Sequence, residues 1–315
     1  MKSNVVRKVG LMLSLVVASA LSSCGGGTQI EAFVPNRIIV FGDENNVIDS
    51  AGRKYSINGL NATSGALDCT VNPIWIQSMA TAYGFVFPDC NPTNRATTSR
   101  IYAVADSKTA DVKTQIDGFL AAGGVFNPKD LVLMMSGQND VWEQYALYPA
   151  TPIETLNAEL TRRGVAYAQQ VNRIAGLGAK IVVPKLFQLG WTPFAGTEQV
   201  TQTTGDNRVN VIRSLVKSFN DGWFATLVND ANHIGQFDPD QNFSPIVANA
   251  GNAGLSNSRT AACLATAVLP NCNSQTLIPG ATATSYLWAD AKRLGYQGHL
   301  QLSSLAFTRS NGNPF

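Results

Sequence analysis

Four polar side chains, contributed by three distant stretches of the chain, carry the chemistry that this sequence offers: Glu44, Asn139, Asp290 and Arg293. Glu44 and Asn139 each follow a short apolar run that is typical of a buried strand. Because sites in parallel sheets lie beyond the carboxyl ends of the strands, we expect these two side chains to meet in one cleft. A carboxylate can act as a nucleophile or a general base, and an amide can stabilise an oxyanion. A guanidinium is permanently charged and cannot relay a proton.

These side chains belong to blocks that resemble the SGNH (GDSL-type) ester hydrolases, and the blocks come in the family's order. In that family, Gly-Asp-Ser presents the nucleophile, Gly-x-Asn-Asp supplies an oxyanion-hole asparagine, and Asp-x-x-His supplies the base and the acid that orients it. This sequence has Gly42-Asp43-Glu44, Gly137-Gln138-Asn139-Asp140 and Asp290-Ala291-Lys292-Arg293 at the matching places. The resemblance extends from about Arg37 to the end of the chain, and it implies a fold rather than a function.

The sequence departs from the family pattern at both reacting groups. Glu44 stands at the nucleophile position and Arg293 at the base position, whereas Asp290 keeps the orienting acid and Asn139 keeps the oxyanion donor. Ala105 falls at the oxyanion-hole glycine, in a segment that has lost both of the family's glycines. Removing the nucleophile or the base of a serine hydrolase lowers turnover roughly a million-fold. The family's usual esterase mechanism is therefore expected to be absent.

Glu44 and Arg293 are instead predicted to form a bidentate, charge-assisted ion pair in the space of the lost serine and histidine, with Asp290 as a second acceptor. Partly buried charges need such partners, because an unpaired charge is costly. His299, six residues beyond the base position, is the alternative candidate for a base. The family also has a histidine there, where it looks structural, so we expect a structural role for His299.

Three classes of function fit these residues. The first is an SGNH-like pseudoenzyme that binds a ligand, such as an acyl chain or an esterified glycan, or that supports a neighbouring envelope protein. The second is an active ester hydrolase with an unconventional group, either Glu44 with water or a serine such as Ser50 or Ser136. The third is a structural or adhesive envelope lipoprotein without a small ligand. The two opposite-charge replacements favour the pseudoenzyme.

The N-terminus has the pattern of an export signal. Three basic residues precede an apolar run over 9–21, which is too short to span a membrane comfortably. The run leads to Cys24 and three glycines, a pattern that resembles a bacterial lipobox. The resemblance implies a signal peptide over 1–23, lipid attachment at Cys24 and a glycine-rich tether over 24–36, and Gly25 favours the outer membrane. The alternative is an ordinary secretory signal with an incidental cysteine.

Charge and composition exclude several partners. The formal net charge is +2, and removal of the segment before Cys24 takes away three positive charges and no negative ones, which leaves −1. This balance indicates no basic face for nucleic acid. The chain has only the histidines His233 and His299 and no Cys-x-x-Cys spacing, so neither a metal nor another cofactor is expected. The predicted partner is the membrane, reached through the lipid on Cys24.

Four cysteines remain after Cys24, in a compartment where disulfides persist. Sequence alone allows three pairings. Proximity favours Cys69 with Cys90 and Cys263 with Cys272, each pair closing a short loop.

Between the blocks, strands alternate with helices, which predicts one α/β domain over 37–315 with a three-layer, doubly wound parallel sheet. The periodicity predicts helices over 152–175 and 209–227 and a buried strand over 179–184. The chain has 315 residues, 45% of them apolar and 14% charged, which is enough for a sizeable core. The segment 241–280 is interpreted as a polar insertion rich in Asn and Ala.

Overall fold

A five-stranded parallel sheet in the order β2-β1-β3-β4-β5 forms the centre of the fold. The computed structural model describes residues 33–201 and 205–312, so the predicted signal peptide, Cys24 and most of the predicted tether lie outside the described residues. The strands are β1 (Arg37–Gly42), β2 (Arg100–Ile101), β3 (Asp130–Met135), β4 (Lys180–Pro184) and β5 (Ile234–Phe237). The chain adds β2 on one side of β1 and the later strands on the other side, so the winding reverses between β1 and β3.

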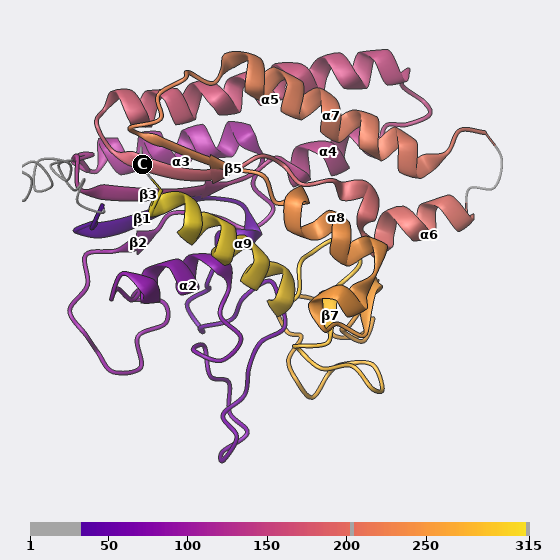
Figure 1. Cartoon of the computed structure of the whole chain (residues 1–315), viewed down its shortest axis with the longest axis horizontal. Helices are drawn as coiled ribbons and strands as arrows, with labels where there is room; N and C mark the ends of the chain where they lie inside the picture. Colours follow the sequence, from indigo (N-terminus) through magenta and orange to yellow (C-terminus); the bar gives the residue numbers. More distant parts are fainter. Residues whose placement is uncertain (1–32, 202–204, 313–315) are drawn as a thin grey trace, which may run out of the picture. The chain divides into compact units, whose positions relative to one another are not determined.

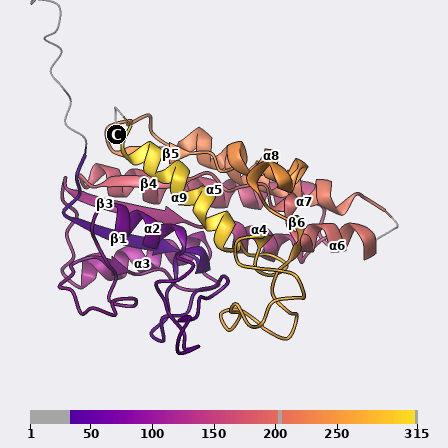
Figure 2. The ribbon, with the colours of Figure 1, turned by 60° about the horizontal axis from the view of Figure 1, so that its bottom comes forward.

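Helices cover both faces of the sheet. Figures 1 and 2 show α3, α5 and α7 over one face and α2 and α9 over the other. The helices are α2 (Trp75–Ala82), α3 (Thr109–Ala121), α4 (Gln138–Tyr145), α5 (Ile153–Gly176), α6 (Pro193–Thr201), α7 (Arg208–Thr226), α8 (Asp240–Ala248) and α9 (Tyr296–Ser310), with short 3-10 turns η1 (Glu44–Asn46), η2 (Leu189–Trp191) and η3 (Ala250–Ala253). This is the predicted three-layer α/β fold, and α5, α7 and β4 confirm the predicted elements.

After their first, charged residues, the central strands β1 and β3 continue as uninterrupted apolar runs because both of their faces are covered. Ile38 to Phe41 in β1 are at most 1% exposed, and Leu131 to Met135 in β3 are at most 2% exposed. A strand that is buried on both faces reads as a continuous apolar run rather than as an alternation. In the ranges that the structure describes, we find no helix that combines the length and the hydrophobicity needed to cross a membrane.

The segment 241–280 differs from its interpretation as a polar insertion. Its beginning belongs to α8, where Phe243 is fully buried and Ile246 and Val247 lie on the same apolar face. Three apolar residues within two turns are too few to reveal a helical period in the sequence. Further along, β6 (Asn257–Ala261) pairs in parallel with β7 (Tyr286–Trp288) in a separate two-stranded sheet.

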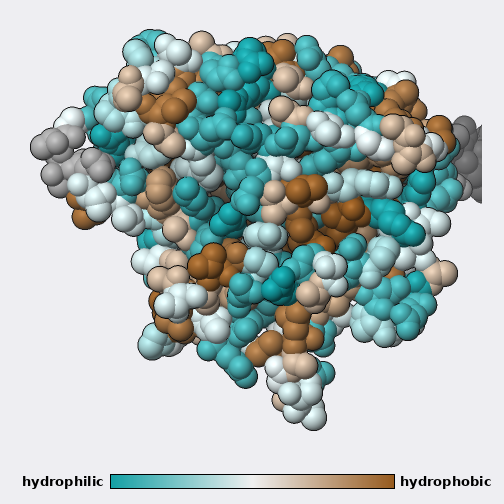
Figure 3. Space-filling view, turned by 180° about the vertical axis from the view of Figure 1, so that it is seen from behind, coloured by the Kyte–Doolittle hydropathy of each residue, from teal (hydrophilic) through white to brown (hydrophobic). Residues whose placement is uncertain are grey.

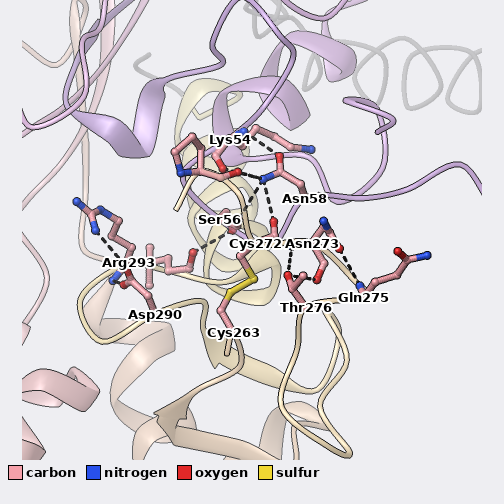
Figure 4. The surroundings of a disulfide bond; sticks show 12 residues. Lys54, Ser56, Asn58, Cys263, Cys272, Asn273, Gln275, Thr276, Asp290 and Arg293 are labelled. Atoms are coloured by element: carbon pink, nitrogen blue, oxygen red, sulfur yellow. Dashed lines mark hydrogen bonds and ion pairs between the residues drawn. A yellow bond between two sulfur atoms is a disulfide. The ribbon is translucent and has the colours of Figure 1, made fainter. Parts of the chain in front are cut away.

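Both predicted disulfides are present. Cys69 pairs with Cys90, and Cys263 pairs with Cys272. Figure 4 shows the second disulfide among the polar contacts that surround it. The Asn58 side chain donates to the backbone carbonyl of Cys272 at 3.0 Å, and the Asn58 backbone N–H donates to the same oxygen at 2.9 Å. The loop after β1 is thereby tied to the loop that connects β6 with β7.

Candidate active site

Two neighbouring strands bring Glu44, Gln138 and Asn139 together. Glu44 begins η1 directly after the turn that ends β1, and Gln138 and Asn139 begin α4 directly after β3. The two strands stay in register to their carboxyl ends, where Gly42 lies opposite Met135. A Cβ atom at Gly42 would lie 2.0 Å from the carbonyl oxygen of Met135, and the backbone φ there is +133°, so this turn requires glycine.

Four donors hold the Glu44 carboxylate. Its Oε1 accepts hydrogen bonds from Gln138 Nε2 at 2.6 Å and from Arg293 Nε at 3.1 Å. Its Oε2 accepts hydrogen bonds from Asn139 Nδ2 at 2.7 Å and from the backbone N–H of Asp106 at 3.1 Å. The Glu44 side chain is only 1% exposed. Each oxygen therefore has two donors, and almost none of the carboxylate faces solvent.

Arg293 makes one hydrogen bond to Glu44 rather than the predicted bidentate pair. Its Nη1 donates to Asp290 Oδ2 at 3.0 Å, and its Nη2 donates to Asp106 Oδ1 at 3.2 Å. The guanidinium is thus divided among three carboxylates, and the side chain is 22% exposed. Burial lowers the pKa of Arg293, but the charges of Glu44 and Asp290 outweigh this effect, and the net pKa is raised. A bidentate pair would need a second guanidinium nitrogen on Glu44 Oε2, and that oxygen already accepts hydrogen bonds from Asn139 and the Asp106 N–H.

Asp290 fixes the arginine in two ways. Its Oδ1 accepts the backbone N–H groups of Lys292 at 2.8 Å and of Arg293 at 2.7 Å, and its Oδ2 accepts the Arg293 side chain (Figure 4). The carboxylate therefore sets both the local turn and the direction of the guanidinium. Asp290 occupies the position that the family resemblance gives to the orienting acid, and here the group that it orients is an arginine.

The loop amide that reaches Glu44 belongs to Asp106, one residue beyond Ala105. Asp106 has a positive φ of 61°, which aspartate adopts more readily than most residues because its short side chain is tolerated there. Asn139 Nδ2 also donates to the backbone carbonyl of Ser107 at 3.1 Å, which fastens this loop to α4. In the part of the chain that the structure describes, Ala105 makes no hydrogen bond to Glu44.

Gln138 is the site residue that sequence reasoning missed. It fills the variable position of the Gly-x-Asn-Asp block, which carries no motif signal. Its side chain is 1% exposed and makes the shortest of the four hydrogen bonds to Glu44. Its burial, which requires a hydrogen-bond partner for the amide, becomes visible only in the structure.

Asp43 precedes Glu44 and caps the η1 turn that Glu44 begins. Its Oδ1 accepts the backbone N–H and the side-chain amide of Asn45, both at 3.0 Å. Burial, with a further contribution from the Glu44 charge, raises the pKa of Asp43 well above its usual range.

The other candidate groups do not form a serine–histidine pair. His299 in α9 is 1% exposed, its ring nitrogens have no hydrogen-bond partner within residues 33–201 and 205–312, and burial lowers its pKa to about 3. His233 Nδ1 lies 2.8 Å from Asp230 Oδ2. Ser136 is 3% exposed, and Ser50 lies on an exposed turn. Among the described residues, neither histidine makes a hydrogen bond to Ser50 or Ser136.

Aromatic side chains and a lysine pack beside Arg293. Lys292 Nζ lies 4.4 Å from the ring centroid of Phe194 and 5.1 Å from that of Trp142. The Phe194 backbone N–H donates to Ala291 O at 2.8 Å, so the start of α6 rests on the 290–293 turn. Burial and the charge of Arg293 lower the pKa of Lys292. Across the described residues, no group of three His, Cys, Asp or Glu side chains is arranged to hold a metal ion.

Comparisons with known proteins identify the fold. No protein-family profile matches the sequence, and no curated protein sequence matches it. Among solved structures, a lipase from a goat rumen metagenome aligns with 89% of this chain and 99% of its own, with 11% identity and a TM-score of 0.51. An acetylxylan esterase from Geobacillus stearothermophilus aligns with 90% of this chain and 97% of its own, with 15% identity and a TM-score of 0.46.

A member of the lipolytic G-D-S-L family from Veillonella parvula aligns with 86% of this chain and 96% of its own, at 12% identity and a TM-score of 0.39. At 11% identity, the alignment with the rumen lipase bears on architecture and leaves the reaction to be argued from the site. The chain therefore shares the α/β fold of that lipase, with a parallel sheet between two layers of helices.

Proposed function

We propose that this protein is a lipid-anchored envelope protein in which an SGNH hydrolase-like fold has become a non-hydrolytic binding or supporting module. The observation that carries this proposal is the occupancy of the site: the Glu44 carboxylate takes the side-chain donor of Asn139 and the loop N–H of Asp106. In the resembled enzymes, an asparagine and a loop amide stabilise the oxyanion of the reacting ester. Here a permanent part of the chain already uses both donors.

Three physical arguments oppose hydrolysis at this site. Arg293 cannot act in place of the missing histidine, because an arginine does not release its proton at accessible pH. Each oxygen of Glu44 accepts two hydrogen bonds. A nucleophilic attack by the carboxylate would therefore have to break some of these hydrogen bonds before a covalent bond to the substrate could form. An ester carbonyl would also find no free oxyanion donor, and losing a single such donor costs a hydrolase roughly a hundredfold to a thousandfold in turnover.

The test is direct. Purified wild-type protein should neither react with a fluorophosphonate probe nor hydrolyse a short acyl ester above background. The wild-type chain should be compared with Glu44→Gln and, as a matched control, with Glu143→Gln, whose carboxylate lies on the surface beside Lys108. Hydrolysis by the wild type that is abolished by Glu44→Gln but kept by Glu143→Gln would replace this proposal with a carboxylate-based hydrolase.

The anchor is tested separately from the chemistry. Mass spectrometry of the N-terminal peptide from the mature protein should find acyl chains on Cys24, and Cys24→Ala should release the protein from the membrane fraction. An unmodified peptide that begins elsewhere would refute the anchor and leave the non-hydrolytic site intact.

A further inference from the structure

Lys292 has an unusual environment for a lysine, because its amine lies among aromatic rings at the rim of the candidate site. Its Nζ is 4.4 Å from the ring centroid of Phe194 and 5.1 Å from that of Trp142. These two rings meet edge to face at 5.2 Å, and Tyr145 adds a third ring 5.9 Å from Phe194. Trp142 and Tyr145 are 8% and 6% exposed, so the amine borders the apolar core on this side.

The Lys292 amine has no conventional partner. Throughout residues 33–201 and 205–312, Nζ makes neither a hydrogen bond nor an ion pair, and the two rings are its recorded contacts. The backbone N–H groups of Lys292 and Arg293 both donate to Asp290 Oδ1, which fixes the two cations side by side on one turn. The Lys292 side chain is half-buried and Ala291 beside it is exposed, so the amine is not sealed in the core.

The other lysines in the described part of the chain are placed differently. Most have an acceptor for the amine, either a carboxylate or a backbone carbonyl: Lys108, Lys113, Lys185, Lys217, Lys54 and Lys180. Lys129 is exposed. Figure 3, a view from behind, shows a surface on which hydrophilic residues predominate and hydrophobic ones form small groups, which is the usual setting of a lysine. Among the described lysines, Lys292 combines an amine without an acceptor with an aromatic setting.

This setting favours the uncharged form of the amine. Burial lowers the pKa of Lys292, and the positive charge of Arg293 lowers it further. The charges of Asp290, Glu198 and Glu44 act in the opposite direction and do not cancel the shift. An ordinary lysine, with a pKa of about 10.4, is uncharged in only about one molecule in a thousand near pH 7.4. Lys292 therefore presents more uncharged amine at neutral pH than an ordinary lysine does.

Lys54 shows that a lowered pKa alone does not make a lysine reactive. Burial lowers its pKa to about 8. Its side chain is fully buried, however, and its amine donates to three backbone carbonyls, those of Cys69, Val71 and Asn72. An amine that is held in this way has no access to a ligand. The geometry therefore distinguishes Lys292 from Lys54.

We propose that Lys292 is a reactive amine that binds a small aldehyde reversibly as an imine. A lysine becomes a nucleophile when an apolar pocket or a neighbouring cation disfavours its charged form, and Lys292 has both. The nitrogen lone pair attacks the carbonyl carbon, and a proton passes from nitrogen to oxygen, which gives a carbinolamine. The hydroxyl group then leaves as water with the second nitrogen proton, and a C=N bond remains. The step needs neither an oxidant nor a reductant.

The aldehyde is the chemistry that two kinds of ligand share. The open-chain form of a reducing sugar carries one, and so does a short apolar chain with an oxidised end. Either would place its C–H groups beside the rings of Phe194 and Trp142, which flank the amine. The reaction uses neither Glu44 nor the lipid on Cys24, so this inference goes beyond the function proposed above and stands independently of it.

The experiment exposes the purified wild-type protein to hexanal or to glyceraldehyde, with cyanoborohydride as the hydride donor that traps an imine as a secondary amine. Peptide mass spectrometry then measures the labelling rate of each lysine separately. At neutral pH, Lys292 should be labelled at least about threefold faster than Lys129, although Lys129 is the more exposed of the two. Faster labelling by hexanal would indicate an apolar ligand, and faster labelling by glyceraldehyde would indicate a sugar.

Two variants and a denatured sample test whether the environment causes the difference. Lys292→Arg keeps a positive charge on the rings but removes the nucleophile, so the fast labelling should disappear. Lys129→Arg is the matched control and should leave the fast labelling unchanged. In denaturant, Lys292 and Lys129 should react at equal rates, because the rings and Arg293 no longer surround the amine. In the folded protein, labelling of Lys292 should also reach its full rate at a lower pH than labelling of Lys129.

The outcomes separate this inference from the non-hydrolytic site. Labelling of Lys292 that is no faster than labelling of Lys129 in the folded protein overturns the reactive amine, and so does a difference that persists in denaturant. Neither result bears on Glu44, which is tested by ester hydrolysis.

Discussion

Replacing Glu44 with alanine should leave a vacant anion site that a small carboxylate can refill. The substitution removes one methylene and the carboxylate, which together correspond to acetate. Gln138 Nε2, Asn139 Nδ2, Arg293 Nε and the Asp106 N–H would still point at the space, because other contacts hold them. Asn139 keeps its hydrogen bond to Ser107 O, and Arg293 keeps its bonds to Asp290 and Asp106.

The loss of stability can be estimated from what each donor retains. A buried donor left without a partner costs about 1–3 kcal/mol. Gln138 is fully buried, and within the described residues its amide nitrogen has Glu44 as its acceptor and no other, so it carries most of this cost. The other three donors keep partners or lie nearer to solvent. We therefore expect Glu44→Ala to lower the free energy of unfolding by about 3 kcal/mol, or roughly 6–10 °C in Tm for a domain of this size.

Acetate should restore part of that loss. If acetate binds the vacant site with a Kd of about 20 mM, then 200 mM acetate stabilises the variant by about 1.4 kcal/mol, or a rise of roughly 3–5 °C in Tm. Wild type should show no such rise, because Glu44 already occupies the site. Thermal unfolding in sodium acetate and in sodium chloride of equal ionic strength measures the difference.

Glu143→Ala is the matched control for this test. Its side chain is 39% exposed and pairs with Arg163 on the surface, so the loss should stay below about 1 kcal/mol and acetate should not reverse it. An equal effect of acetate on wild type and on Glu44→Ala, or an unchanged Tm in Glu44→Ala, would show that the four donors do not depend on the carboxylate.

Three further outcomes are expected. Arg293→Ala should destabilise by about 2–3 kcal/mol, and by more than Glu44→Ser combined with Arg293→His, because only the single change leaves a buried carboxylate without its cation; denaturant titration compares them. His299→Leu should flatten the pH dependence of the free energy of unfolding. In the unfolded chain His299 binds a proton below about pH 6.5, whereas in the folded chain it does so only near pH 3. The wild type should therefore lose about 2 kcal/mol of stability from this residue between pH 6 and pH 4.5, and the variant should not. Replacing Cys263 and Cys272 with serine should lower the unfolding free energy by about 3 kcal/mol, as judged by the same titration.

The meeting of Glu44 and Asn139 could be predicted because each follows a strand that the sequence reveals, whereas the place of Arg293 followed from the family resemblance. β1 and β3 are long apolar runs, and the carboxyl ends of parallel strands lie at one edge. The two disulfides followed from proximity in sequence. Both kinds of inference need only the path of the backbone.

The division of Arg293 among three carboxylates could not be predicted in the same way. It depends on the positive φ of Asp106, which turns both the N–H and the carboxylate of that residue toward the site. It also depends on Gln138, whose amide takes one side of Glu44 Oε1. Such details are set by loop conformation and rotamers, for which a single sequence carries little signal.

The presence of Asn139 at the oxyanion position is weak evidence that this site catalyses ester hydrolysis. An oxyanion donor that had lost its reaction would be free to change unless something else needed it. Glu44 supplies that need, because its carboxylate is almost fully buried and depends on Asn139 at 2.7 Å and on the Asp106 amide at 3.1 Å. Leaving such a charge without donors is costly. If the site does not hydrolyse esters, as we propose, donors placed to stabilise a transient negative charge also suit the permanent one of Glu44, and Asn139 then has a structural role.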